Sequence, residues 1–145
     1  MALKASTGLR NAMLEGDPFA FAIASPLIII YSGTPPATAD AAITGSVLST
    51  ISADATGDPL TWGVAANGTL PKDPSQVWRG VNTGSGTATH WRMVASDDTG
   101  LLSTIERRLQ GLCGVAGSDL NMSSINLTSG ASQTIDACNV SLPTF

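Results

Sequence analysis

Few side chains in this chain could carry out catalysis. The 145 residues include a single histidine, His90, which is the only candidate base for activating a nucleophile. The cation Arg92, two residues further on, would lower the pKa of His90 and would not orient the imidazole as a carboxylate does. No GxSxG nucleophile elbow accompanies the histidine. We therefore expect His90 to be a half-buried strand histidine, and we expect that the protein is not an enzyme.

Two pairs of acidic residues could act in acid–base catalysis or bind calcium together with backbone carbonyls. Asp97 and Asp98 are adjacent, and Asp54 and Asp58 bracket a short loop that contains glycine. Neither pair has the calcium-loop pattern of alternating acids with a distal glutamate. Aspartate near glycine is typical of turns, because aspartate accepts bonds from local backbone donors and glycine adopts left-handed conformations. We predict turns at both places.

The two cysteines, Cys113 and Cys138, have no metal-ligand spacing, and His90 lies far from both in sequence. They could form one disulfide if the strands that carry them are neighbours. We favour two buried free thiols, because we recognise no export signal. We therefore predict no metal, no cofactor and no catalytic or cofactor-binding residue.

Three tryptophans offer the remaining functional chemistry, because indole rings can stack on sugars. Trp62, Trp78 and Trp91 fall in three different segments that we expect to be extended. Tryptophans on the strands of a β domain more often pack inside it. We expect these three to belong to the core.

The charge of the chain is low and scattered. Charged residues make up 12% of the sequence, about half the usual share, and the formal net charge is -4. Nucleic-acid backbones are bound by clustered Lys and Arg, whereas this chain scatters seven. We expect no nucleic-acid partner. The sparse charge fits either a plain monomer of low charge or a surface that neighbouring subunits partly cover.

Residues 19–31 (FAFAIASPLIIIY) form a long apolar run that could be a secretory signal. Against that interpretation, Glu15 and Asp17 stand immediately before the run and Pro26 interrupts it. The run is also too short to span a bilayer. We predict that it is buried protein core, and we expect neither secretion nor membrane anchoring.

The local patterns predict one helix followed by many short strands. Residues 7–16 carry capping residues at the start, an apolar stripe and a terminal glycine. Extended segments separated by Gly, Asn, Asp or Pro are predicted at residues 27–32, 46–52, 60–64, 76–81, 87–94, 107–112, 123–127 and 133–142. This pattern predicts an all-β fold: an antiparallel β-sandwich or barrel with one short N-terminal helix. We expect a single domain over residues 1–145, in which residues 1–16 are a candidate helical arm.

Several long segments resemble a group of small virion proteins of tailed bacteriophages. These are LKASTGLRNAML, IIIYSGTPPATADAAI, VWRGVNTGSGTATHWRMV and SDLNMSSINLTSGASQTIDACNVSLP, which make up about half of the residues and are distributed over nearly the whole chain. The resemblance implies a structural component of the phage particle, located in the virion after assembly in the host cytoplasm.

Within that group, composition and length favour a capsid decoration, or cement, protein that binds and stabilises the head shell. The implied partner is the major capsid protein, and similarity to decoration proteins implies a homo-oligomer, with a trimer as the expected form. The alternative is a tail or fibre-associated module, with tail proteins as partners and with host surface sugar as a ligand. A small hydrolase would require His90 beside an acid and a hydroxyl in one pocket.

Overall fold

The computed structural model describes residues 3–142 and 144, and it confirms the predicted all-β fold. Two short helices, α1 (Thr7–Leu14) and α2 (Phe19–Ala22), precede most of the strands. The strands are β1 (Lys4–Ala5), β2 (Pro26–Tyr31), β3 (Val47–Ala53), β4 (Thr69–Pro71), β5 (Trp78–Val81), β6 (Gly86–Thr87), β7 (His90–Ala95), β8 (Leu109–Gly114), β9 (Leu120–Asn121), β10 (Asn126–Leu127), β11 (Ser132–Ile135) and β12 (Asn139–Ser141).

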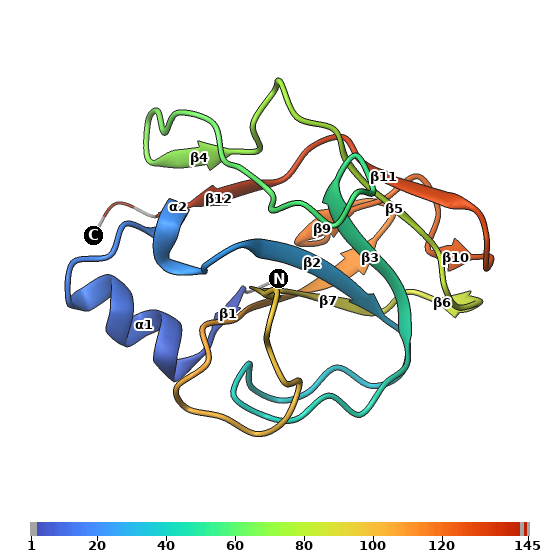
Figure 1. The fold of residues 1–145 in the computed structure, drawn as a ribbon, viewed down its shortest axis with the longest axis horizontal. Helices are drawn as coiled ribbons and strands as arrows, with labels where there is room; N and C mark the ends of the chain where they lie inside the picture. The colour runs from blue at the N-terminus through green and yellow to red at the C-terminus, as the bar shows by residue number, and fades with distance from the viewer. Residues whose placement is uncertain (1–2, 143, 145) are drawn as a thin grey trace.

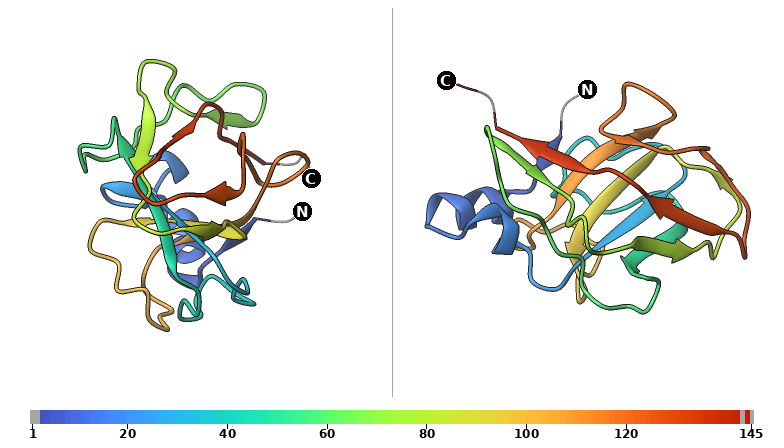
Figure 2. Two further views of the ribbon diagram at one scale, coloured as in Figure 1. Left: turned by 90° about the vertical axis from the view of Figure 1, so that its right-hand side faces the viewer. Right: turned by 90° about the horizontal axis from the view of Figure 1, so that it is seen from above.

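One large sheet organises the molecule (Figure 1). Its strands follow the order β1-β8-β7-β2-β3-β5-β11, and β9 adds to β8 as a parallel pair. The remaining strands form two small antiparallel ribbons, β6–β10 and β4–β12. The views in Figure 2 show these ribbons and the large sheet wrapped around a common interior. The architecture is therefore β-sandwich-like, as expected, with one parallel pair that the sequence did not predict.

Strand β2 lies in the middle of the sheet because its β-branched residues suit a strand with neighbours on both sides. Ile28 and Ile30 are completely buried in the core. The prediction that the whole run 19–31 is core was wrong at Phe21 of α2, which is 80% exposed, whereas Ala22 of the same helix is completely buried. A bend at residues 23–25 divides the run into a short helix that is buried on one side and a strand that begins at Pro26.

A β-bulge interrupts the two-residue alternation of side chains in β3. The register with β2 shifts between Ile30 and Tyr31, which pair with Ser49 and Val47. Leu48 and Ser49 are consequently both buried, although strict alternation would place them on opposite faces. Val47 and Ser49, which regular alternation would place on one face, differ in burial, because Val47 is exposed and Ser49 is buried.

The helix predicted over residues 7–16 is confirmed and ends at Leu14. The Ser6 hydroxyl accepts a hydrogen bond from the Leu9 amide and another from the Arg108 amide, and it donates one to the Glu106 carbonyl. Leu9 is completely buried, and a Cβ at Gly8 would lie 2.1 Å from the Ile105 carbonyl oxygen. The segment considered as an arm thus packs closely against the rest of the domain.

Other strand predictions were wrong at specific places. Residues 60–64 make only an isolated bridge at Trp62 rather than a strand, and residues 133–142 contain two strands instead of one. Residues 66–74 (ANGTLPKDP) have the composition of a surface loop, but they contain β4, which pairs with β12. Strands at residues 27–32, 46–52, 76–81 and 107–112 are confirmed with ends shifted by a few residues.

Candidate interaction surface

His90 is enclosed in the protein and does not form a catalytic arrangement. The side chain is completely buried rather than half-buried as predicted, and its ring stacks on Tyr31 with centroids 5.2 Å apart. Its Nδ1 lies 2.9 Å from the Thr89 hydroxyl oxygen, and Nε2 has no partner among the described residues. Burial and the charge of Arg92 lower the pKa of His90 to about 4. His90 is therefore a neutral, buried imidazole near neutral pH.

The predicted turns at the acidic pairs are confirmed. Asp98 Oδ1 accepts a 2.7 Å bond from the Gly100 amide, and Asp58 Oδ2 accepts a 2.9 Å bond from the Thr56 hydroxyl. Asp54 forms an exposed ion pair with Arg79. Within residues 3–142 and 144, no group of three or more His, Cys, Asp or Glu residues could hold a metal ion.

Asp98 has a second role that the sequence did not reveal. Its Oδ2 accepts a 2.6 Å hydrogen bond from Nε of Arg108, whose side chain is completely buried. Arg92 is buried as well, with 1% of its surface exposed. Arginine is mostly exposed in proteins and is almost never fully buried unless it is paired. The amino-acid composition therefore gave no sign that Arg92 and Arg108 are buried. They form a polar layer on the face of the sheet opposite the apolar core.

The cysteines are free thiols, as predicted. Cys138 is buried and Cys113 is partly buried in β8. Burial raises the pKa of each thiol to about 12, and the nearby Asp119 carboxylate contributes at Cys113. Neither thiol is activated as a nucleophile, because it is the thiolate that reacts.

The tryptophans belong to the core, as predicted for Trp78 and Trp91, which are 0% and 1% exposed. Trp62 is partly buried and packs edge-on against Trp78, with ring centroids 5.3 Å apart. On its other side it lies 5.7 Å from the ring of Phe19. The buried indoles cannot stack on a sugar, so no aromatic sugar platform forms at Trp78 or Trp91.

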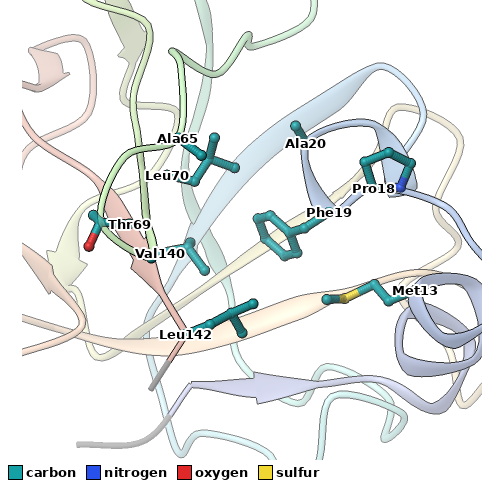
Figure 3. Close-up of a pocket in the computed structure, with 10 residues that line it drawn as sticks. Met13, Pro18, Phe19, Ala20, Ala65, Thr69, Leu70, Val140 and Leu142 are labelled. Carbon is teal, nitrogen blue, oxygen red and sulfur yellow. The ribbon is translucent and has the colours of Figure 1, made fainter. Parts of the chain in front are cut away.

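The surface feature that stands out is a group of hollows beside α2, which we call the apolar trough; Figure 3 shows the first of them. Its first part is a hollow of about 270 Å³, into which Phe19 points from α2, Met13 from α1 and Val140 from β12. The lining residues are Met13, Pro18, Phe19, Ala20, Ala65, Gly68, Thr69, Leu70, Val140 and Leu142. None of these side chains carries a charge.

The trough continues along residues 59–74. A second hollow of about 630 Å³ shares Ala20, Ala65 and Leu70 with the first. A third hollow of about 530 Å³ shares Trp62 and Gly63 with the second and contains Asp73, the single charged side chain among the residues lining the three hollows. The apolar trough is thus the name for three neighbouring hollows that share lining residues and are nearly uncharged.

Large apolar side chains stand exposed on the walls of the trough. Phe21, Val64 and Leu142 are 80%, 88% and 63% exposed, and each lines one of the three hollows. A separate group, Leu101, Leu102 and Ile105, is exposed on the loop between β7 and β8. Exposed apolar side chains gathered in one patch are typical of interaction surfaces, whereas scattered ones are ordinary.

The chain was compared with known proteins at three levels. No protein-family model, no curated protein and no solved structure matches it. Neither α1 nor α2 of the described residues has the length and hydropathy of a membrane-spanning helix.

Proposed function

We propose that this chain is a structural protein of a bacteriophage particle, and specifically a capsid decoration protein that binds and stabilises the head shell. The proposal rests on the resemblance of its segments to small phage virion proteins. It is also supported by one structural observation, the apolar trough with Phe21, Val64 and Leu142 exposed along it. In this proposal the protein acts through adhesion, with no cofactor and no catalytic residue.

The physical basis of the proposed adhesion is burial of apolar surface against the major capsid protein. Each Å² of apolar surface removed from water contributes roughly 25 cal/mol. Binding costs rotational, translational and side-chain freedom, so a single small patch binds weakly. Copies joined in a homo-oligomer, with a trimer as the expected form, would add their contacts through avidity. The low charge of the surface would allow such copies to lie side by side with little repulsion.

The test is a binding experiment with purified heads that lack the protein. We expect the wild-type chain to bind, and the double variant Phe21→Ser, Val64→Ser to bind at least tenfold more weakly. Both side chains are largely exposed, so the variant should remain folded. Val81→Ser is the matched control, because Val81 is half exposed on β5 and does not line the trough.

Binding to purified tails but not to heads would instead support the alternative, a tail-associated module. Binding of the double variant and the wild type with equal strength would remove the trough from the proposal. Host sugar binding through Trp78 or Trp91 is disfavoured because both indoles are buried.

A further inference from the structure

The segment between β2 and β3 lies across the polar face of the sheet. We define residues 33–45 as the strap. Every backbone carbonyl from Pro36 to Ala41 accepts a hydrogen bond from a side chain beneath or beside it. The donors, in order along the strap, are Gln110 Nε2, Lys4 Nζ, Arg92 Nη2, Arg108 Nη1 twice, and Arg92 Nη2 again. The strap is not part of a strand ladder. It is held by the buried side chains of Arg92, Arg108 and Gln110, by the exposed Lys4, and by two backbone hydrogen bonds, from the Ile43 amide to the Gly100 carbonyl and from the Ser103 amide to the Asp40 carbonyl.

The two arginines under the strap are compensated unequally. Arg108 donates from Nε to Asp98 Oδ2 at 2.6 Å and from Nη2 to Glu106 Oε2. Arg92 donates from Nε to the neutral Gln110 side chain at 2.8 Å, and its Nη1 has no partner among the described residues. The carboxylates of Asp98 and Glu106 thus supply the negative charge that balances the two buried guanidinium groups of this layer.

Other charged or titratable groups face this layer from each packed element. They are Lys4 from β1, Arg10 from α1, Tyr31 from β2, Asp40 from the strap, His90 from β7, and Asp98 and Glu106 from the loop before β8. Burial and the charge of Arg108 lower the pKa of Arg92. Desolvation raises the pKa of Glu106, but bonds from Thr99 and the charge of Arg108 outweigh it and hold the net pKa below its ordinary value of 4.5.

We propose that the strap is an acid-released cover of the sheet. Protonation of Glu106 removes one of the two carboxylates that compensate the buried charges of Arg92 and Arg108, and the strap then lifts so that water reaches the two arginines. A carboxyl group whose pKa is lower in the folded than in the unfolded protein stabilises the folded state at pH values above its unfolded pKa. This contribution is lost as the pH falls through the pKa of the group in the folded protein. The release therefore begins below about pH 4.5 and grows as Glu106 is protonated.

The other face of the same strands explains why the strap moves before the sheet. Tyr31 pairs with His90, and Arg92 pairs with Gln110, so these four side chains share the polar face. Ile28 pairs with Met93 and Ile30 with Trp91 on the opposite face, which is the apolar core. Acid changes no charge in that core, so the sheet stays folded while its cover opens.

Hydroxyl-radical footprinting with mass spectrometry can read the two faces separately, because neighbouring residues of β7 report on opposite sides. Tyr31 and His90 report on the face under the strap, and Trp91 and Met93 report on the core. All four are 5% exposed or less in the folded protein. Between pH 6 and pH 3.5 we expect the oxidation rates of Tyr31 and His90 to rise at least tenfold while Trp91 and Met93 stay protected.

Variants at pH 7 separate carboxylate protonation from protonation of His90 and from general acid effects. We expect the double variant Asp98→Asn, Glu106→Gln to show the same pattern at pH 7, where His90 is neutral. Asp97→Asn is the matched control, because it removes the adjacent, exposed carboxylate and should leave all four rates unchanged. If the double variant does not fold, the comparison between pH 6 and pH 3.5 is made on His90→Gln, in which no imidazole can be protonated and Tyr31 reports on the face under the strap.

Two results would overturn the proposal. One is protection of Tyr31 and His90 at pH 3.5 equal to that at pH 6. The other is a simultaneous rise at all four reporters, which would mean that acid unfolds the whole domain and that the strap has no separate transition.

Discussion

The imidazole of His90 lies nearly parallel to the ring of Tyr31, with centroids 5.2 Å apart and planes inclined by 16°. The two residues pair across β7 and β2, so the stack crosses the centre of the sheet. The lone histidine is therefore a structural element of the polar face, and its ionisation is linked to folding.

Stability should fall as the solution is acidified from pH 7.5 to pH 5. The folded pKa of His90 is about 4, compared with 6.5 when unfolded, so the unfolded chain binds the proton first. We expect a loss of about 2 kcal/mol in the free energy of unfolding, measured by urea denaturation at the two pH values. His90→Gln should show a much flatter dependence. An equal loss in this variant would assign the pH dependence to other groups.

Removing the buried carboxylate next to Arg108 should destabilise the protein strongly. Asp98→Ala leaves the Arg108 guanidinium buried with one of its counter-charges missing, which costs about 3 kcal/mol. Asp97→Ala, at the neighbouring exposed position, should change the free energy of unfolding by less than about 0.5 kcal/mol. Equal effects of the two substitutions in urea denaturation would contradict the buried ion pair.

The two thiols should be inert in the folded protein. Their pKa values of about 12 leave almost no thiolate at pH 8, so a disulfide reagent should react slowly with Cys113 and Cys138. In denaturant both thiols should react within minutes without any reductant. Failure to detect two thiols in the denatured chain would show that a disulfide exists.

The N-terminal helix should contribute to the stability of the domain. Leu9 is completely buried, so Leu9→Ala should cost about 2–5 kcal/mol in the free energy of unfolding. Leu14→Ala is the matched control on the same helix, because Leu14 is 86% exposed and should change little. A small effect of Leu9→Ala in denaturant unfolding would mean that residues 1–16 behave as a detachable arm.

Local patterns in the sequence were sufficient to predict the helix and the central strands. The helix could be predicted from the capping residue Ser6 and from the apolar stripe through Leu9 and Met13. Strand β2 could be predicted from the β-branched residues before Tyr31. One missed strand also had a local signal. Asn67 and Gly68 have positive φ values of 51° and 74°, as expected of an Asn-Gly two-residue turn, and β4 begins directly after them.

Long-range partners could not be predicted in this way. Besides Gln110 and Glu106, the acceptors of Arg92 and Arg108 are Asp98 and carbonyls of the strap. Nothing in the spacing of the strap and the two arginines predicts that they meet. The apolar trough likewise combines α2 with β4 and β12, which lie far apart in the chain. Its wall residue Phe21 was predicted as core, because an apolar run by itself does not reveal which of its residues face solvent.

The measurement that tests the proposed function most directly is the copy number of this protein in purified phage particles, obtained by quantitative mass spectrometry against the major capsid protein. We predict hundreds of copies per particle, which remain with the heads when heads and tails are separated. Absence of the protein from the particles would contradict the account, whereas a handful of copies that follow the tails would replace the head-binding role with the tail-associated one.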